Sequence, residues 1–230
     1  MYFSKKIGLI ALGAILLLLT ACTETPKPTP ELEPTPVQEP VQEPEIEPQD
    51  EQSEENDKPG EGVPPTAKEA ATTVLRALKN GDMKTVAAWA SRKGVRFSPY
   101  GYVDTKTDLV FSRDELEGLM EDSTERVWRT YPGSGELIEL TFKEYYNQFV
   151  YDADFMSDAE VSVNKVLGES TTINNLNEVY PKDSHNFVEY YIDGIDPVYE
   201  GMDWRSLRLV FEKIGDDSAL VGIIHDQWTP

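Results

Sequence analysis

The stretch Trp204-Arg205-Ser206-Leu207-Arg208-Leu209-Val210-Phe211-Glu212-Lys213-Ile214 decides the fold of this chain. Its aromatic, aliphatic and β-branched residues favour an extended strand. A second apolar run, residues 219–224, follows the turn residues Gly215-Asp216-Asp217-Ser218, and this arrangement predicts a β-hairpin. Residues 187–192 have the composition of a further strand, and residues 161–167 alternate weakly. The end of the chain is therefore expected to form an antiparallel meander.

Helix signals come before this sheet. Thr66 and Glu69 have the spacing of a capping box. Apolar residues then recur every three or four positions until Asn80-Gly81 ends the pattern, and Asp82 begins a second short helix. The apolar stripe of the first helix consists of Ala70, Ala71, Val74, Leu75 and Leu78.

Two more capping boxes pair Ser112 with Glu115 and Thr141 with Glu144, so each predicts a further helix. Short extended segments are expected at residues 94–100, 127–131 and 137–140. Helices first and strands afterwards indicate an α+β fold, with N-terminal helices packed against a curved antiparallel sheet.

The N-terminus has the pattern of an export signal. Lys5 and Lys6 give a short positive region, and residues 7–19 form an unbroken run of apolar residues and glycine. This run is shorter than the roughly 20 residues that span a bilayer, which favours a signal peptide. An uncleaved membrane anchor is the alternative interpretation.

The apolar run ends in Leu19-Thr20-Ala21-Cys22, which resembles the lipobox of bacterial lipoproteins. The resemblance implies a signal peptide over residues 1–21, cleavage before Cys22, and a diacylglyceryl group on Cys22 that attaches the protein to the membrane. Cys22 is also the only cysteine, so no internal disulfide is available. We therefore expect a lipid-anchored protein on the extracytoplasmic face of the cell membrane.

Residues 22–65 have the composition of a disordered linker. From residue 23 onwards they hold 11 of the 16 prolines and 13 acidic residues against two basic ones. Such a segment buries too little apolar surface to offset its ordering entropy, and its proline and charge keep it extended. We expect a spacer that holds a domain away from the membrane, with a proline-rich ligand for another domain as the alternative.

Residues 66–230 are expected to form one globular domain, since they are long enough to bury a substantial core. They carry most of the remaining charge of a chain whose formal net charge is −21. This acidity argues against nucleic acid and against anionic lipid as electrostatic partners.

The opening of this domain, Val74-Leu75-Arg76-Ala77-Leu78-Lys79-Asn80-Gly81-Asp82, resembles the start of NTF2-like domains, and residues 207–211 and 220–224 suit their C-terminal hairpin. The resemblance implies a helical layer inside a strongly bent sheet, forming a cone. Residues 94–100, 202–209 and 221–226 also resemble a set of uncharacterised bacterial lipoproteins. The NTF2-like superfamily includes both enzymes and binding modules, so the fold does not decide the function.

The sequence offers few candidates for catalysis. It has two histidines and no metal-ligand spacing of the HExxH or Cys/His kind, so we expect no catalytic metal and no cofactor. Acidic clusters at residues 152–154 and 193–203 leave calcium as a lesser alternative. His225 and Asp226 are candidates for a general acid and base, although neighbours on a strand point to opposite faces. The alternative is that both residues lie at a strand end near solvent and have no catalytic role.

The candidates for ligand binding are arginines and aromatic residues, namely Arg96, Tyr100, Tyr146, Arg205 and Trp228. An arginine on an apolar strand face needs an acidic partner, for which Asp152, Asp203 and Asp226 are available. The alternative is an arginine that binds a carboxylate or phosphate of a ligand.

We therefore expect a non-enzymatic lipoprotein whose domain binds a small ligand or an envelope protein. The alternative is an NTF2-like enzyme with His225 or Asp226 as the acid or base, and it requires both residues to converge with Arg96 and Arg205 in a cavity.

Overall fold

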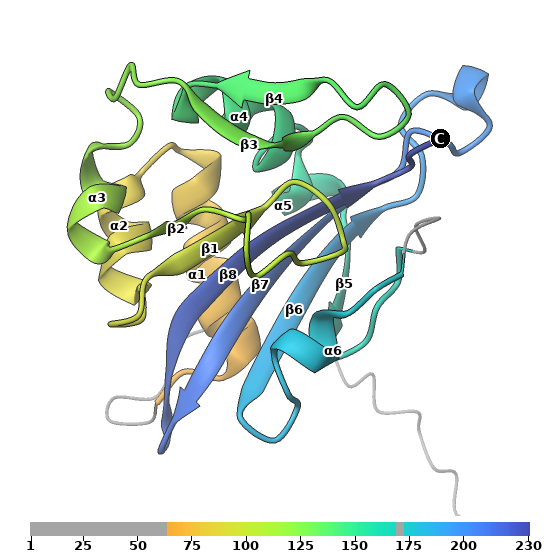
Figure 1. The fold of residues 1–230 in the computed structure, drawn as a ribbon. Helices are drawn as coiled ribbons and strands as arrows, with labels where there is room; N and C mark the ends of the chain where they lie inside the picture. The colour runs from red at the N-terminus through yellow and green to blue at the C-terminus, as the bar shows by residue number, and fades with distance from the viewer. Residues whose placement is uncertain (1–63, 169–172) are drawn as a thin grey trace, which may run out of the picture. The chain divides into compact units, whose positions relative to one another are not determined.

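A computed structural model describes residues 64–168 and 173–230, and its largest element is a six-stranded sheet with strand order β2-β1-β8-β7-β6-β5 (Figure 1). The strands of this sheet are β1 (Val95–Ser98), β2 (Val110–Phe111), β5 (Glu160–Val163), β6 (His185–Ile192), β7 (Arg205–Ile214) and β8 (Asp217–Gln227). A separate two-stranded sheet pairs β3 (Arg126–Thr130) with β4 (Leu137–Leu140).

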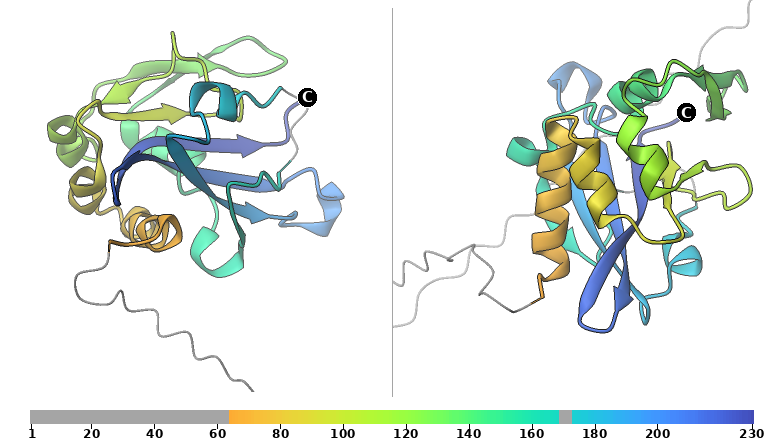
Figure 2. Two further views of the ribbon diagram at one scale, coloured as in Figure 1. Left: turned by 90° about the horizontal axis from the view of Figure 1, so that it is seen from below. Right: turned by 90° about the vertical axis from the view of Figure 1, so that its left-hand side faces the viewer.

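The helices lie on both sides of the large sheet, most of them on one side (Figure 2). That side carries α1 (Ala67–Lys79), α2 (Met83–Trp89), α3 (Arg113–Gly118), α4 (Phe142–Phe149) and α5 (Phe155–Asp158). The opposite side is covered by α6 (Leu176–Val179) and the segment around Val103. A short 3-10 helix, η1 (Pro197–Tyr199), follows β6. This arrangement confirms the α+β class with helices packed on a curved sheet.

All three predicted capping boxes are present. In the first, the Thr66 amide donates to Glu69 Oε2 at 2.6 Å and the Glu69 amide donates back to Thr66 Oγ1 at 3.3 Å. Ser112 with Glu115 and Thr141 with Glu144 form the same reciprocal pair at the starts of α3 and α4. Each box satisfies amides that have no partner inside the helix, which explains why the helices begin at these residues.

The predicted β-hairpin is confirmed with a shorter turn. Only Gly215-Asp216 lie between the strands, because Ile214 already pairs with Asp217. Gly215 has a φ of 62°, and a positive φ at the first of two turn residues alone is typical of the type II′ turn that matches strand twist.

The sheet differs from the predicted antiparallel meander in one pairing. β5 to β8 are antiparallel, as expected, but β1 runs parallel to β8, with Phe97 opposite Ile223. A parallel pair needs a long connection between its strands, and here most of the domain provides it. Sequence patterns carry no signal for such a distant pairing.

A β-bulge in β8 interrupts the strict alternation of side chains along this strand. Val210 pairs with Gly222 while the next residue, Phe211, pairs with Leu220, so Val221 is the additional residue. Val221 therefore packs with Ile224 rather than sharing the face of Ile223 and His225, as strict alternation predicts.

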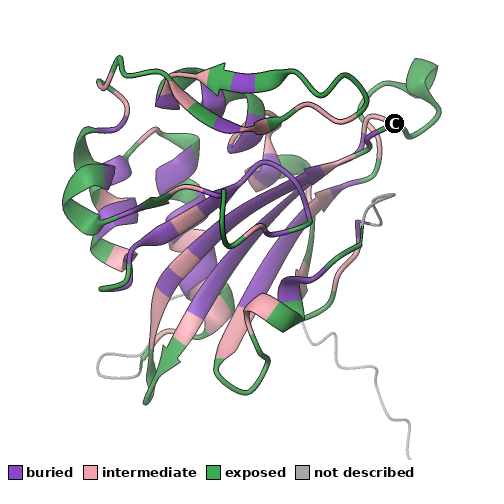
Figure 3. Cartoon of the chain, in the orientation of Figure 1, coloured by how far each residue is buried: buried purple, intermediate pink, exposed green. Residues whose placement is uncertain are grey.

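Each face of the sheet has its own hydrophobic core, and the central strands are buried along most of their length (Figure 3). The core under the helices is large and aromatic. In it, Trp128 stacks on Tyr145 with ring centroids 3.6 Å apart, and Phe97 makes edge contacts with Phe111 and Phe142. The smaller core on the opposite face consists of Val103, Leu176, Phe187, Val210 and Ile224.

The opposite face also contains a fully buried charge cluster. Arg208 lies between two carboxylates, with Nη2 2.9 Å from Glu189 Oε1 and Nη1 3.0 Å from Asp226 Oδ2. Glu189 also accepts hydrogen bonds from the amides of Leu167 and Gly168, and the Gly168 carbonyl accepts one from Arg208. The cluster thus attaches the segment after β5 to the sheet.

Within residues 64–168 and 173–230, no helix is long and apolar enough to cross a bilayer. The predicted signal peptide, Cys22 and the predicted linker as far as residue 63 lie outside the described residues.

We predict that Gly101→Ala destabilises the domain by about 1–3 kcal/mol, the cost typical of overpacking. A Cβ at this position would lie 2.2 Å from Asp226 Oδ2, and Arg208 holds that carboxylate in place. Urea unfolding measures the change. Gly118→Ala is the control, because a Cβ there has open space around it. Equal stability of the two variants would contradict this account.

Candidate functional site

His225 lies on the helix side of β8, enclosed between two hydrogen-bond acceptors. Its Nε2 is 3.2 Å from Asp152 Oδ2 and its Nδ1 is 3.2 Å from the Pro99 carbonyl oxygen. The side chain has no solvent exposure. Both partners of the ring are acceptors, a backbone carbonyl oxygen and a carboxylate oxygen.

Arg205 binds the same carboxylate, with Nε 2.7 Å from Asp152 Oδ2. Burial by itself raises the pKa of Asp152, but His225 and Arg205 together outweigh burial and lower that pKa below its usual value. One carboxylate thus connects β7, β8 and the segment after α4. The expected acidic partner for Arg205 is present, and it is Asp152.

Asp226 lies on the other side of the sheet from His225, paired with Arg208. Burial raises the pKa of Asp226, and the Arg208 guanidinium opposes this shift. The two residues are therefore separated by the strand that carries them, and each has a buried partner, Asp152 for His225 and Arg208 for Asp226. His225, Asp226, Arg96 and Arg205 do not meet in one cavity.

The aromatic candidates are mostly part of the core. Tyr100 packs edge-on against Phe149, and Tyr146 of α4 is buried in the core between the helices and the sheet. Burial raises the pKa of each tyrosine to about 12. Trp228, near the C-terminus, is 42% exposed. None of the three lines the Arg96 cavity described next.

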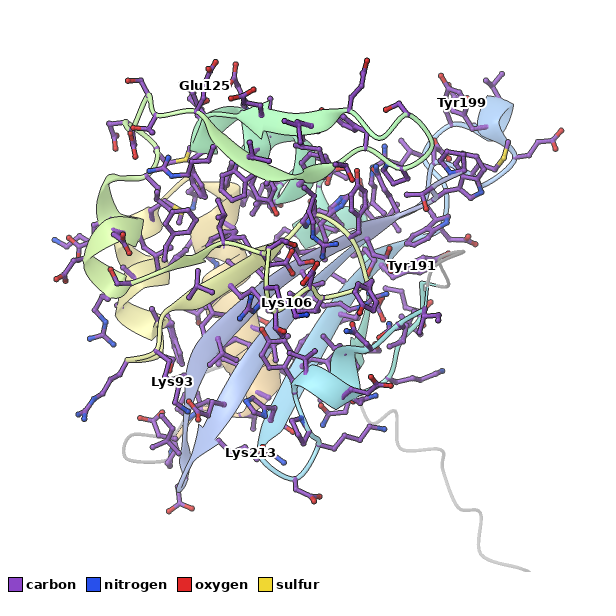
Figure 4. The ribbon with its side chains drawn as sticks, viewed as in Figure 1. Lys93, Lys106, Glu125, Tyr191, Tyr199 and Lys213 are labelled. Carbon is purple, nitrogen blue, oxygen red and sulfur yellow. The ribbon has the colours of Figure 1, made fainter. Side chains whose placement is uncertain are left out.

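Arg96 points away from the core, between the buried side chains of Val95 and Phe97. It lines a cavity of about 310 Å³ on the side of the sheet opposite the large helical layer. We call this space the Arg96 cavity, and its lining includes Lys93, Arg96, Val110, Tyr180, His185, Glu212 and Val221. Lys93 and Lys213 lie at the same end of the sheet in Figure 4.

Arg96 is bound by neutral groups. Its Nη1 donates to the Asp108 carbonyl oxygen at 3.2 Å, and the guanidinium also hydrogen-bonds the Tyr180 hydroxyl. Burial raises the pKa of Tyr180, and Arg96 opposes that shift. The described part of the chain places no carboxylate within 4.0 Å of Arg96, whereas each other arginine that is at least partly buried has one within 3.0 Å, namely Arg126, Arg129, Arg205 and Arg208.

The remaining walls combine charge with an apolar surface. Lys93 Nζ is 2.7 Å from Glu212 Oε1, so these two charges neutralise each other. His185 Nδ1 lies 2.9 Å from Ser184 Oγ, and no described residue bonds its Nε2. Arg96 therefore gives the cavity an excess of positive charge, although the chain as a whole is strongly acidic.

Tyr180, His185 and Lys93 are site residues that sequence reasoning missed. Tyr180 reaches Arg96 because β8 has glycine at position 222, where a Cβ would lie 3.1 Å from the Tyr180 hydroxyl oxygen. The one available signal was Gly222 inside an apolar strand, which often marks a close approach by another group. The long segment between β5 and β6 that carries Tyr180 gives no such signal.

The acidic clusters do not form a metal centre. Among residues 64–168 and 173–230, no three His, Cys, Asp or Glu side chains are placed to hold a metal ion.

Comparison with known proteins identifies similar solved structures at low identity. A DUF4783 family protein from Bacteroides uniformis has a TM-score of 0.32 and 12% identity, covering 67% of this chain and 94% of that chain. A protein of the NTF2-like family from Streptomyces avermitilis has a TM-score of 0.30 and 13% identity, covering 69% and 90%. A domain of unknown function with a cystatin-like fold from Nostoc punctiforme has a TM-score of 0.31 and 8% identity, covering 69% and 72%.

No protein-family model matches the chain, and a search of curated proteins finds no match. The likeness to solved structures, with TM-scores of 0.30 to 0.32, assigns neither a family nor an activity to this chain. The α+β class rests on the strand order and helix packing described above.

We predict that Asp152→Asn destabilises the domain by about 3–5 kcal/mol near neutral pH, because it leaves Arg205 and His225 without their shared anion. The lowered pKa of Asp152 means that the ion pair contributes fully above about pH 4, the usual aspartate range, and less as pH falls through the lowered value. Urea unfolding at several pH values measures the difference between wild type and variant. Exposed Asp183→Asn is the control, and a difference that stays constant into acid would contradict the assignment.

Proposed function

We propose that this protein is a lipid-anchored protein of the cell envelope whose folded domain binds a small anionic ligand in the Arg96 cavity. The observation that carries the ligand proposal is the missing carboxylate at Arg96. A partly buried guanidinium loses hydration, and proteins usually compensate it with an anion. Arg126, Arg129, Arg205 and Arg208 have their anions within the domain, and a ligand would provide the anion for Arg96.

The composition of the Arg96 cavity supports a ligand with one anionic group and an apolar body. Guanidinium groups bind carboxylates and phosphates through paired hydrogen bonds, and the free Nε2 of His185 adds a further polar contact. Val110, Val179 and Val221 provide an apolar wall. The volume of about 310 Å³ is at the lower end of the range for small-molecule sites.

The proposal involves no catalysis. A general acid and base must both reach the reacting groups of one substrate. His225 and Asp226 project to opposite sides of β8 and are occupied by Asp152 and Arg208.

The membrane attachment is proposed from the sequence. The lipobox-like Leu19-Thr20-Ala21-Cys22 follows a charged start and an apolar run, and an acidic proline-rich segment comes after it. Two acyl chains on Cys22 would give stable attachment, where a single chain is marginal.

Arg96→Gln is expected to weaken binding of an anionic ligand by about tenfold or more, the usual loss for a charged hydrogen bond. The probes are inorganic phosphate and glutarate, titrated into the full chain in detergent and followed by NMR chemical shifts of residues around Arg96. Arg92→Gln is the matched control, because Arg92 is exposed and carries the same charge. Arg96→Lys should retain part of the affinity. Equal binding by Arg96→Gln and Arg92→Gln, or saturable binding of neither probe, would refute the ligand proposal.

Cys22→Ala is expected to release the protein from membranes or to leave it as an unprocessed precursor. Fractionation of cells grown with labelled palmitate measures both results. Cys22 is the only cysteine, so the variant disturbs no disulfide. A variant that stays in the membrane with normal processing and palmitate label would contradict the anchor.

A further inference from the structure

The Tyr180 hydroxyl is a second donor group in the wall of the Arg96 cavity. It lies against β8 at Gly222, where a Cβ would come within 3.1 Å of the hydroxyl oxygen. A guanidinium has only donors, so the hydroxyl oxygen accepts in its hydrogen bond with Arg96. The O–H of Tyr180 then remains, and no described residue accepts it. A ligand in the cavity could therefore accept from both side chains.

Tyr180 is held in place by contacts that do not involve its hydroxyl. Its amide donates to the Leu176 carbonyl oxygen at 2.8 Å, and its ring packs edge-on against His185 with centroids 5.4 Å apart. The ring also packs against the small core on this face of the sheet. A change to phenylalanine would therefore keep these contacts and remove only the hydroxyl.

The charged side chains around the Arg96 cavity leave one positive charge without a counter-ion. Lys93 is paired with Glu212 at 2.7 Å. Asp108, whose backbone carbonyl binds Arg96, has its side chain paired with Arg129 at 2.6 Å. With histidine counted as neutral, Arg96 is the unpaired charge of the described lining. A ligand with a single negative charge would balance it, whereas a phosphate monoester carries a charge of about −1.5 to −2 near neutral pH.

The arrangement of the donors fits a carboxylate. A carboxylate has two oxygens, so one can accept from the Arg96 guanidinium while the other accepts from the Tyr180 hydroxyl. The apolar part of the wall consists of Val110, Val179 and Val221, which would contact an alkyl chain. Both the charge and the wall therefore favour an apolar molecule with one carboxylate.

We propose that the ligand of the Arg96 cavity is an alkyl monocarboxylate whose two oxygens accept from Arg96 and Tyr180 and whose chain lies against the valines. This inference rests on the ligand proposal above, and it names the class of ligand and a second binding residue. It can fail while the Arg96 site itself stands.

The first test compares ligands, titrated at pH 8 into the full chain in detergent and followed by NMR shifts of the amides around Arg96 and Gly222. Pentanoate and butyl phosphate carry the same four-carbon chain, and pentanoate should bind about fivefold more tightly or better, because the second charge of the phosphate has no partner. Acetate, which lacks most of the chain, should bind about tenfold more weakly than pentanoate. The neutral pentan-1-ol should give no saturable shift.

The outcomes of this comparison separate the two proposals. Butyl phosphate, acetate or pentan-1-ol binding as tightly as pentanoate would overturn the monocarboxylate inference and leave the Arg96 ligand proposal standing. Saturable shifts with none of the three anions would overturn both.

The second test concerns Tyr180. Tyr180→Phe should weaken pentanoate binding by about fivefold, the usual loss for one hydrogen bond. Tyr199→Phe is the matched control, because Tyr199 is 53% exposed and lies outside the cavity lining. In an Arg96→Gln background the change at Tyr180 should have a smaller effect, since both side chains bind the same carboxylate, whereas a general structural role would lower affinity equally in both backgrounds. Equal binding by Tyr180→Phe and Tyr199→Phe, or full additivity with Arg96→Gln, would overturn the role of Tyr180.

Discussion

Arg208 buries a full positive charge inside a β-sheet, and much of the structure follows from that constraint. A guanidinium without solvent exposure is stable only when anions and acceptors surround it. Glu189 from β6 and Asp226 from β8 supply the anions, and Gly168 supplies a carbonyl. Because Glu189 also binds the amides of residues 167 and 168, the charge on β7 determines which segment covers this face. The segments that cover this face of the sheet are held by the Arg208 ion pairs as much as by the small apolar core.

The same requirement operates on the other side of β7. Arg205 faces the helices, and Asp152 reaches it from the segment after α4, which also connects that segment to His225. The side chains of Arg205 and Arg208 point to opposite faces of β7, so these two arginines join different parts of the chain to the same sheet. Breaking either pair would leave a buried charge, which costs more than the pair contributes in net stability.

Local sequence signals predicted the fold well where the interactions are local. Thr66, Ser112 and Thr141 each bind a glutamate three residues away, so the helix starts could be read directly. The hairpin follows from two apolar runs beside Gly215. Positions 205 and 208 are an odd number of residues apart, so alternation puts their side chains on opposite faces, and an arginine on an apolar strand face needs an acidic partner. The parallel pairing of β1 with β8 and the bulge at Val221 were not predictable, because both depend on contacts between distant segments.

The candidate sites show the same division. Arg96 was a candidate from the sequence, but only the fold brings Tyr180, which precedes β6, and His185, the first residue of β6, beside it. The acidic residues were visible as two clusters, yet only the fold brings Asp152 and Asp193 to one pocket. The formal net charge of −21 therefore does not give the local charge of an individual cavity. Charge compensation differs between the arginines: Arg208 is enclosed by two carboxylates inside the domain, whereas no carboxylate of the described residues lies within 4.0 Å of Arg96, which is why we propose an anionic ligand there.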